Sequence, residues 1–403
     1  MQHLRLFLPC AAGVEALLAD EAARIAGCPV QARRAGVRLS APWRDAMRLN
    51  LYSRLAQRVL IELAHGGYRH EQDLYEVAAG VAWEAWFTPR QSFRIELTAQ
   101  RSPLKSLNFA ALRIKDAIAD RFRDRAGSRP DVDTRAPQVR IHAHLTTDRL
   151  TLYIDSSGEP LFKRGWRADT GDAPLKETLA AAMLAASGWD ARTPLYDPCC
   201  GSGTIAIEAA QIACGVAPGL RRRFGFERLA PFQPHVWQAL REEAEAARHA
   251  PTAPVFGSDV AHRMVDFAQR NAERAGVAEA VQLRGGDALQ RLPPCEEPGV
   301  LLLNPPYGER IGVAGVAGER ARPGREAALA EGGGDFFARL AAHWKHHYAG
   351  WTAWVLTPDT KLASRMRLKE SRRIPMWNGP IECRLFRFDM VQGSARRPAA
   401  PAA

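Results

Sequence analysis

Residues 304–307, Asn-Pro-Pro-Tyr, follow three leucines that are typical of a buried strand. Two adjacent prolines remove two backbone donors and restrict the backbone of the residues before them. The side-chain oxygen of Asn304 and the carbonyl oxygen of Pro305 are therefore acceptors with little conformational freedom, and they suit the two hydrogens of a planar NH2 group. Pro306 stiffens the segment and Tyr307 offers a flat ring. The alternative is a structural turn with a tyrosine packed on it.

A second motif, DPCCGSG at residues 197–203, lies between a predicted strand and a predicted helix. Gly201 and Gly203 allow a close backbone approach to a ligand, and the helix N-terminus offers unpaired amides. Ala206 stands where a dinucleotide fingerprint has its last glycine or alanine, and the lysine of a phosphate-binding loop is missing. By itself, a tight structural turn explains this motif equally well.

The next two predicted strands end in acids. Asp259 is placed to accept hydrogen bonds from a ribose diol, although it could simply cap the helix that starts at Ala261. Asp287 is placed to accept from an exocyclic amine such as adenine N6, or it is a turn acid. Ligands of open parallel sheets bind at the carboxyl ends of the strands. Four successive strand ends of this kind therefore favour one ligand site over unrelated turns.

The elements that must position these residues alternate between strand and helix from about Pro174 onward, which predicts a doubly wound, mostly parallel sheet. A charged helix is predicted around residues 236–248, and a further helix is predicted over 335–347. Residues 313–334 are rich in Gly, Ala and charge and are predicted to form a mobile insertion. Residues 393–403 are predicted to be a disordered tail.

The first part of the sequence has a mixed α+β pattern. A strand is predicted over 4–8, a helix over 13–25, and a hairpin that turns at Ala35-Gly36, since glycine tolerates positive φ. A second mixed unit runs to about residue 167. The residues of its helix 108–126 that are expected to face a core are Leu112, Ile114, Ile118 and Phe122.

The net charge is +11, and it is unevenly distributed. Residues 1–167 hold 26 basic and 18 acidic residues, or +8, and residues 168–403 hold 29 and 26, or +3. A basic segment beside a nearly neutral one fits a polyanion-binding module, although an ordinary basic surface explains it equally well.

Other classes of protein find little support. The seven cysteines show no CxxC pair and no zinc-ligand spacing, so we expect no metal and a reducing cytosol. No apolar run is long enough for a membrane span. The sequence start is predicted to be a first strand and helix and not a signal peptide.

The chain resembles the THUMP-domain 23S rRNA guanine-N2 methyltransferases. The segments that carry the resemblance are LFLPC, VDTRAPQVRIHAHL, LKETLAAAML, DPCCGSGTIAIEAA, NPPYGER and NGPIEC. This resemblance covers nearly the whole chain. It implies a ferredoxin-like segment (1–42), a THUMP RNA-binding domain (43–165) and a Rossmann-like class I methyltransferase domain (166–392) that binds S-adenosylmethionine. In the best-known members a second methyltransferase domain follows. Because this sequence ends at residue 403, we expect a second activity to be absent or on another chain.

The family implies methylation of the exocyclic N2 amine of a guanine in 23S rRNA, of the guanine-2445 type, in the cytoplasm, on rRNA or a large-subunit assembly intermediate. The motif of Asn304, Pro305, Pro306 and Tyr307 would then be catalytic. The two acceptors would hold the amine and direct its lone pair toward the methyl group, and Tyr307 would stack on the extruded base. The expected cofactor-binding residues are Lys176, Glu177, Asp197, Pro198, Gly201, Gly203, Asp259, Asp287 and Asn304. The expected RNA-binding residues are Lys105, Lys115, Arg121, Lys163 and Arg164.

Several alternatives stay open at the level of sequence. The Asn-Pro-Pro-Tyr motif is shared with DNA adenine-N6 methyltransferases and with enzymes that methylate a glutamine in release factors. The nearest alternative function is that of a tRNA guanine-N2 methyltransferase. An alternative that is not an enzyme is a non-catalytic RNA-binding assembly factor. Lys176 and Glu177 could be a solvent-facing helix pair. Trp166, Phe224, Phe226 and Trp237 are expected to pack in a core, with an RNA path as the alternative.

Overall fold

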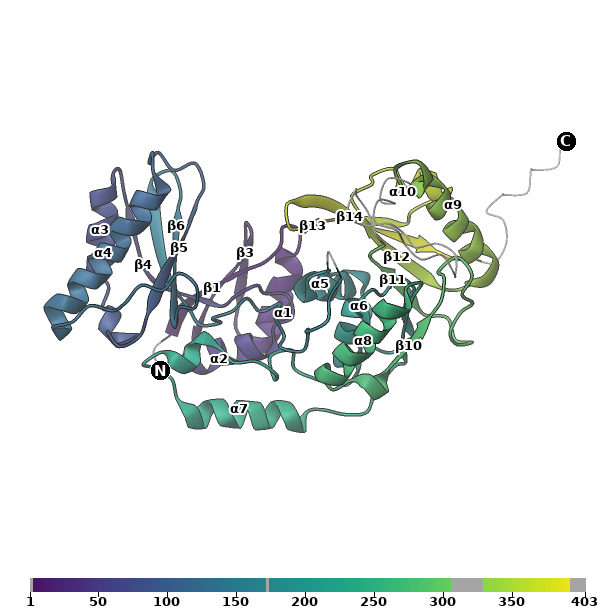
Figure 1. Ribbon diagram of the computed structural model, residues 1–403, viewed down its shortest axis with the longest axis horizontal. Coiled ribbons are helices and arrows are strands. Elements are labelled where there is room, and N and C mark those ends of the chain that lie inside the picture. Colours follow the sequence, from purple (N-terminus) through teal and green to yellow (C-terminus); the bar gives the residue numbers. More distant parts are fainter. Residues whose placement is uncertain (1–2, 172–173, 306–328, 392–403) are drawn as a thin grey trace. The chain divides into compact units, whose positions relative to one another are not determined.

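The computed structural model describes residues 3–171, 174–305 and 329–391, without the side chains of residues 329–335. These residues form two compact units (Figure 1). The first unit comprises Met1–Gly165 and Val216–Arg248, and the second comprises Trp166–Gly215 and His249–Ala403.

The first unit is built on one seven-stranded sheet. Its strands are β1 (His3–Pro9), β2 (Val30–Arg33), β3 (Gly36–Pro42), β4 (Leu60–Gly67), β5 (Phe93–Ala99), β6 (Val139–Leu145) and β7 (Arg149–Asp155). Their order is β2-β3-β1-β4-β7-β6-β5. Antiparallel pairing of Leu6 with Ile61 joins β1 to β4. The predicted ferredoxin-like and THUMP segments therefore share a continuous sheet, while the boundary at residue 42 stays a prediction.

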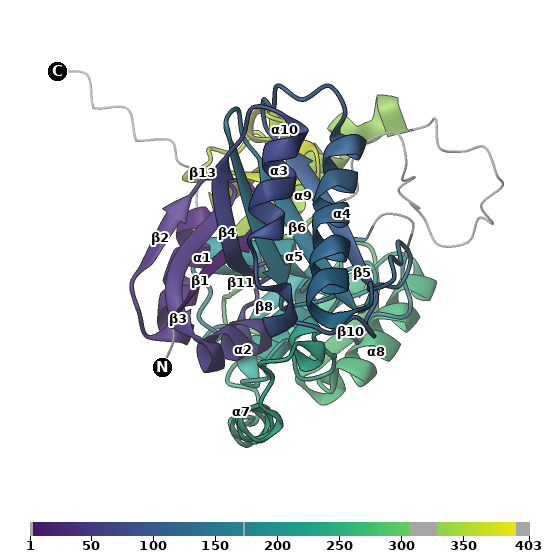
Figure 2. The same ribbon diagram turned by 90° about the vertical axis from the view of Figure 1, so that its left-hand side faces the viewer.

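Helices α1 (Glu15–Ala26), α2 (Trp43–Tyr52), α3 (Glu71–Ala79) and α4 (Leu107–Ala126) complete this unit. Figure 2 shows α3 and α4 side by side against the sheet. Ile114, Ile118 and Phe122 of α4 are buried as predicted, because positions four apart share one face of a helix. Leu112 is 49% exposed, so its prediction was wrong. Leu112 lies two residues before Ile114, so the two side chains point about 200° apart around the helix axis.

The hairpin between β2 and β3 turns differently from the prediction. Ala35 takes the left-handed conformation, with φ of 62°, and Gly36 is the first residue of β3. Gly36 is required for space, since a Cβ there would lie 2.4 Å from the carbonyl oxygen of Leu8.

Residues 216–248, predicted as part of the methyltransferase domain, pack in the first unit. They contain a 3-10 turn, η2 (Gly225–Arg228), and the predicted charged helix, α7 (Pro234–Ala246). The Arg222 guanidinium donates to the carbonyl oxygens of Pro160 and Glu159, each at 2.6 Å. The rings of Phe224, Phe226 and Trp237 are buried against one another, which confirms the expectation of core packing.

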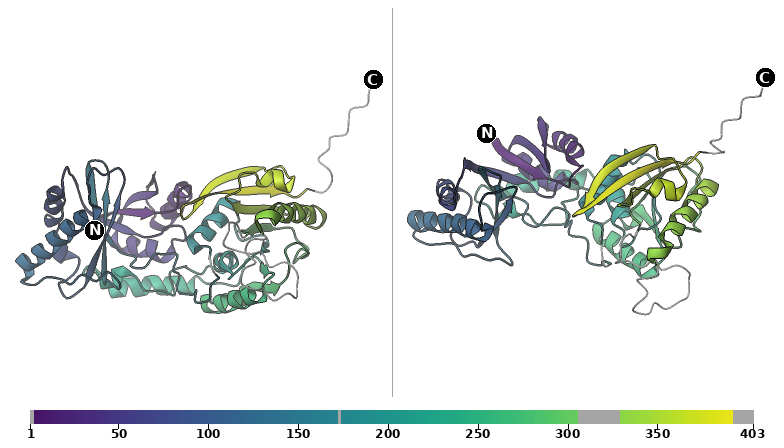
Figure 3. Two further views of the ribbon diagram at one scale, coloured as in Figure 1. Left: turned by 45° about the horizontal axis from the view of Figure 1, so that its top comes forward. Right: turned by 90° about the horizontal axis from the view of Figure 1, so that it is seen from above.

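The second unit contains the predicted doubly wound sheet. Its strands are β8 (Leu195–Asp197), β9 (Val255–Asp259), β10 (Val281–Gly285), β11 (Val300–Leu303), β12 (Thr352–Thr357), β13 (Arg372–Asn378) and β14 (Ile381–Asp389). Their order is β10-β9-β8-β11-β12-β14-β13, and the first five are parallel. Strands β13 and β14, drawn in yellow in Figure 3, lie at one side of the sheet, where β14 is antiparallel to both β12 and β13. This order is that of a Rossmann-like class I methyltransferase fold.

The helices of this unit are α5 (Glu177–Ser187), α6 (Thr204–Ala213), α8 (His262–Ala275), α9 (Leu329–His347) and α10 (Leu362–Met366). Helix α9 begins six residues before the predicted 335, so residues 329–334 of the predicted insertion are helical. The remainder of that insertion, 313–328, and the predicted tail, 393–403, lie outside the described residues.

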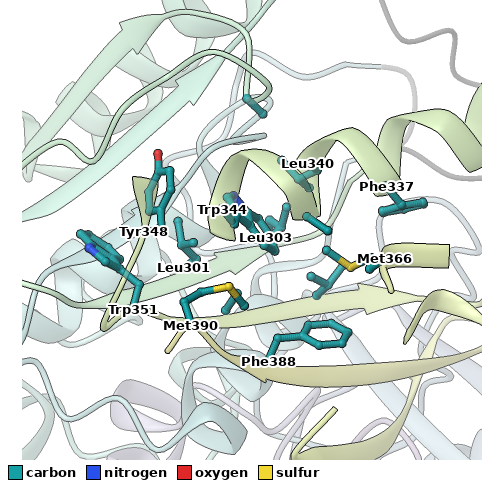
Figure 4. Packing of buried hydrophobic residues seen from close by; sticks show 14 of the residues in the cluster. Leu301, Leu303, Phe337, Leu340, Trp344, Tyr348, Trp351, Met366, Phe388 and Met390 are labelled. Carbon is teal, nitrogen blue, oxygen red and sulfur yellow. The ribbon is translucent and has the colours of Figure 1, made fainter. Parts of the chain in front are cut away.

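The three leucines before Asn304 are completely buried. Leu301 and Leu303 point toward α9, where Trp344 and Leu340 are part of the same apolar cluster (Figure 4). Such a strand is a rigid support for whatever follows it. Among the described residues, no helix is both long enough and apolar enough to span a membrane.

Candidate active site

The four predicted strand ends lie along one edge of the parallel sheet. Asp197 ends β8, Asp259 ends β9, Asp287 follows β10 by two residues, and Asn304 directly follows β11. The pairing of Gly285 with Asp259 places the ends of β10 and β9 level. The strand order reverses between β8 and β11, which is the usual ligand position in such sheets.

Asp259 holds the glycine loop in place. Its Oδ2 accepts a hydrogen bond of 3.0 Å from the Gly201 amide, and its Oδ1 accepts one of 2.9 Å from the Ala261 amide. Asp259 is not the N-cap of α8, because Ala261 takes that position and no side-chain hydrogen bond caps the helix, so the alternative of a helix cap was wrong. Each carboxylate oxygen has a further lone pair with which to accept a ligand hydroxyl.

The two glycines of the loop serve different needs, although both have positive φ. At Gly201 a Cβ would find its nearest neighbour, the Met264 Cε, 4.0 Å away, so the space beside the backbone is open. At Gly203 a Cβ would lie 2.9 Å from the Cβ of Ala268 on α8. Gly203 is therefore required for helix packing, and Gly201 leaves room for a ligand.

Three carboxylates surround the loop. Burial, together with the nearby Asp259, raises the pKa of Asp197 to about 8, although the Cys199 amide donates to Asp197 at 3.1 Å. Burial also raises the pKa of Asp259. The pKa of the Cys199 thiol is raised by burial and by Asp197, Asp259 and Asp287, so all three acids act on this one loop. The described residues include no cluster that could hold a metal ion.

Asn304 carries the clearest chemical signal. Its Oδ1 is buried and has no hydrogen-bond partner among the described residues. An unsatisfied buried acceptor costs about 1–3 kcal/mol, so its presence calls for an explanation. A ligand donor at this strand end would satisfy it. Pro305 is also buried, whereas Pro306 and Tyr307 lie outside the described residues.

The sequence predictions missed Arg167, which links the segment before α5 to the glycine loop. Its guanidinium donates to Glu177 Oε1 at 2.7 Å, to Ser202 Oγ at 2.9 Å and to Thr204 Oγ1 at 2.8 Å. Glu177 is buried, so the solvent-facing alternative for it was wrong, whereas Lys176 is exposed at the start of α5. Only the position of Arg167 near the LKET segment could have drawn attention to it.

Helix α8 also holds the glycine loop in place. The buried Asn271 of α8 donates from Nδ2 to the carbonyl oxygens of Ser202, at 3.0 Å, and Asp169, at 2.9 Å. Hydrogen bonds from Arg270 and Arg274 lower the pKa of Asp169 to about 2. The segment around Asp169 is thereby fixed against α8 and the glycine loop.

The predicted RNA contacts belong to the first unit, and most of them form hydrogen bonds or ion pairs within it. Arg164 is only 2% exposed and donates to the carbonyl oxygens of Leu161 and Arg54, so its prediction is corrected to a structural role. Arg121 forms a paired hydrogen bond with Glu84, at 2.7 and 2.9 Å. Lys115 and Lys163 form ion pairs with Asp116 and Glu159, while Lys105 is exposed in the loop before α4.

Comparisons with known proteins agree with this architecture. Residues 5–60 match the RlmL ferredoxin-like domain, residues 68–155 match the THUMP domain, and residues 164–320 match the RMKL-like methyltransferase domain. The curated "Ribosomal RNA large subunit methyltransferase K/L" of Shewanella loihica is 39% identical over 401 residues, which is 98% of this chain and 54% of that protein. That of Psychromonas ingrahamii is 36% identical over 402 residues. The chain spans about half the length of these relatives.

Solved structures share the whole fold. SMU.472, assigned as a methyltransferase and complexed with SAH, is 26% identical with a TM-score of 0.84, and the match covers 98% of this chain and all of that one. A protein from Listeria monocytogenes that is assigned as an N6-adenine-specific DNA methylase is 27% identical, with a TM-score of 0.83. The match covers 96% of each chain. Together with the three domain matches, these findings confirm the resemblance seen in the sequence motifs. Along its sequence the chain therefore carries, in order, regions that match an RlmL ferredoxin-like domain, a THUMP domain and an RMKL-like methyltransferase domain.

Proposed function

We propose that this chain transfers a methyl group from S-adenosylmethionine to the exocyclic N2 amine of a guanine in 23S rRNA, of the guanine-2445 type, in the cytoplasm. The observation that carries the proposal is the buried Asn304 Oδ1, an acceptor without a partner among the described residues, at the reversal point of the sheet. The rRNA substrate is supported by the names of the relatives and by the THUMP domain.

The strand ends fit the cofactor. The free lone pairs of Asp259 suit ribose hydroxyls, Asp287 suits an adenine amine, and the open space at Gly201 lets the backbone approach closely. When bound, S-adenosylmethionine supplies a methyl group on a positively charged sulfur. The complex of SMU.472 with SAH supports this assignment.

The chain's own contribution is to position the amine. An exocyclic amine is a poor nucleophile because its lone pair is delocalised into the base. Asn304 Oδ1 accepts one of its hydrogens and the Pro305 carbonyl oxygen accepts the other, which draws the nitrogen toward tetrahedral geometry and frees the lone pair. Such positioning and electrostatic gains reach several kcal/mol. Tyr307 stacks on the base, and no early general base is needed because the nitrogen becomes acidic once it is methylated.

The test is transfer of labelled methyl groups from S-adenosylmethionine by the full chain. Undermodified 23S rRNA, assembling large-subunit particles, tRNA, DNA and release factor are offered in parallel. We expect incorporation into 23S rRNA at a guanine N2. Incorporation into tRNA or DNA alone would move the assignment to those substrates. RNA binding without any transfer would favour the non-catalytic assembly factor.

A further inference from the structure

The sheet of the first unit has a groove of about 450 Å³ whose polar lining side chains have no part in the site described above. Along β1 and β3, side chains alternate between the two faces of the sheet. Leu6 and Val37 are buried, and Arg5 and Arg38 next to them are exposed. The polar side chains that line this groove are Arg5, Gln31, Arg38, Ser40, Glu62, His65, Arg149 and Thr151, and we call it the sheet groove.

An irregularity in β4 contributes to the groove. Its pairing with β7 shifts register between Glu62 and Ala64, as at a β-bulge. Residues three apart in a regular strand point to opposite faces, but a bulge re-aims the side chains that follow it. His65 Nδ1 thus lies 2.8 Å from Glu62 Oε1, and both side chains line the groove.

The cations of the groove outnumber its acids. Arg5 and Arg38 share Glu62, at 3.4 and 4.0 Å, and Arg149 forms no ion pair within the described part of the chain. Three arginines face one carboxylate that is itself only 7% exposed. Helix α4, which carries the expected RNA-binding residues Lys115 and Arg121, differs, since most of its basic side chains are paired with acids. The paired residues are Arg113, Lys115, Arg121 and Arg123.

The dimensions favour an extended anion over a small one. The lining residues come from five neighbouring strands, β2-β3-β1-β4-β7, and strands are about 4.8 Å apart, so the groove extends roughly 19 Å across the sheet. In double-stranded DNA the phosphates of one strand are about 3.4 Å apart along the helix axis, and they are farther apart along the backbone itself. The groove therefore matches several successive phosphates. Its guanidinium groups, hydroxyls and amide are donors suited to phosphate oxygens.

We propose that the sheet groove binds the sugar-phosphate backbone of the RNA substrate, through Arg5, Arg38 and Arg149. The groove crosses from the ferredoxin-like strands to the THUMP strands, so both domains hold the RNA as one surface. The inference rests on the proposed function for the identity of the polyanion. It adds a site that the sequence motifs did not indicate.

The experiment measures binding of the full chain to undermodified 23S rRNA over a range of salt concentrations, without cofactor. The test variant combines Arg5→Ala, Arg38→Ala and Arg149→Ala. A matched control combines Arg24→Ala, Arg69→Ala and Arg90→Ala, which removes the same charge from exposed arginines outside the groove. Each lost phosphate contact reduces the slope of log affinity against log salt by about 0.7 to 0.9. The groove variant should lose about 2 to 3 units of slope, and the control should keep the wild-type slope.

Two results would overturn the proposal: a groove variant with wild-type affinity and slope, or a control that weakens binding as much. Arg149→Ala alone removes a side chain that has no ion pair among the described residues. This variant should therefore keep the fold intact, and it tests the contribution of the groove to RNA binding by itself. Methyl transfer by the unaltered chain is measured separately. If it transfers methyl groups and the groove variant binds normally, only the groove proposal fails. If it binds RNA through the groove and transfers nothing, only the proposed function fails.

Discussion

Asn304→Ala separates the chemistry of the site from its stability. The Asn304 oxygen is buried without a partner among the described residues, so the folded protein keeps it at a cost. We expect its removal to abolish most methyl transfer while leaving the protein at least as stable. Most substitutions of a buried polar residue do the opposite, because they break hydrogen bonds within the fold.

The magnitudes follow from the environment of this oxygen. An unsatisfied buried acceptor costs about 1–3 kcal/mol, part of which is offset by the packing of the side chain. The free energy of unfolding of Asn304→Ala should therefore be unchanged or higher by up to about 2 kcal/mol. Loss of one positioned partner of a reacting group typically costs about 2.7–4 kcal/mol in the transition state, or roughly 100- to 1,000-fold in rate.

Asn271→Ala is the matched control, since it removes a second buried asparagine. The Asn271 side chain donates two hydrogen bonds, to Ser202 and Asp169, and its Oδ1 accepts from Arg274 at 2.6 Å. At about 1 kcal/mol for each bond, its loss should lower the free energy of unfolding by about 3 kcal/mol.

Urea unfolding, labelled methyl transfer and calorimetric binding of SAH would be measured on both variants. SAH affinity of Asn304→Ala should stay within a few-fold of the original. If Asn304→Ala unfolded as easily as Asn271→Ala, its oxygen would have a structural partner. If its methyl transfer survived, the acceptor mechanism would be refuted.

The remaining predictions concern the glycine loop and its supports. Arg167→Ala removes one partner of the buried Glu177, and urea unfolding should show a free energy of unfolding that is lower by about 3 kcal/mol; an unchanged midpoint would contradict the pairing. Because burial raises the folded-state pKa of Asp197 to about 8, the folded protein retains a proton that the unfolded chain loses above about pH 4. Its stability therefore falls between about pH 4 and pH 8, by roughly 1.4 kcal/mol per pH unit, and Asp197→Asn should lack this loss in unfolding measured across that range. Gly203→Ala should lower the melting temperature more than Gly201→Ala, because its Cβ would collide with α8, whereas Gly201→Ala should weaken SAH binding more. The reverse order would exchange the roles of the two glycines.

The sequence by itself determined the second unit in outline. Strands and helices alternate there in a regular pattern, and the residues that end each strand are glycines, prolines and acids whose backbone preferences are local. Asp259, Asp287 and Asn304 were therefore identifiable as strand-end residues before any contact was known. The proposed substrate, a guanine of 23S rRNA, came only from the resemblance, because an Asn-Pro-Pro-Tyr motif suits any planar amine.

Only the tertiary structure decided which charged side chains are available. Arg164 and Lys105 are both basic residues of the first unit, yet one is buried under backbone carbonyls and the other is exposed. The roles of Arg167 and of the sheet groove depend on partners that the chain brings together from distant positions, such as Arg5 and Glu62 through the pairing of β1 with β4. Burial and charge pairing are properties of these long-range contacts. A sequence pattern read over one helix or one strand carries no information about them.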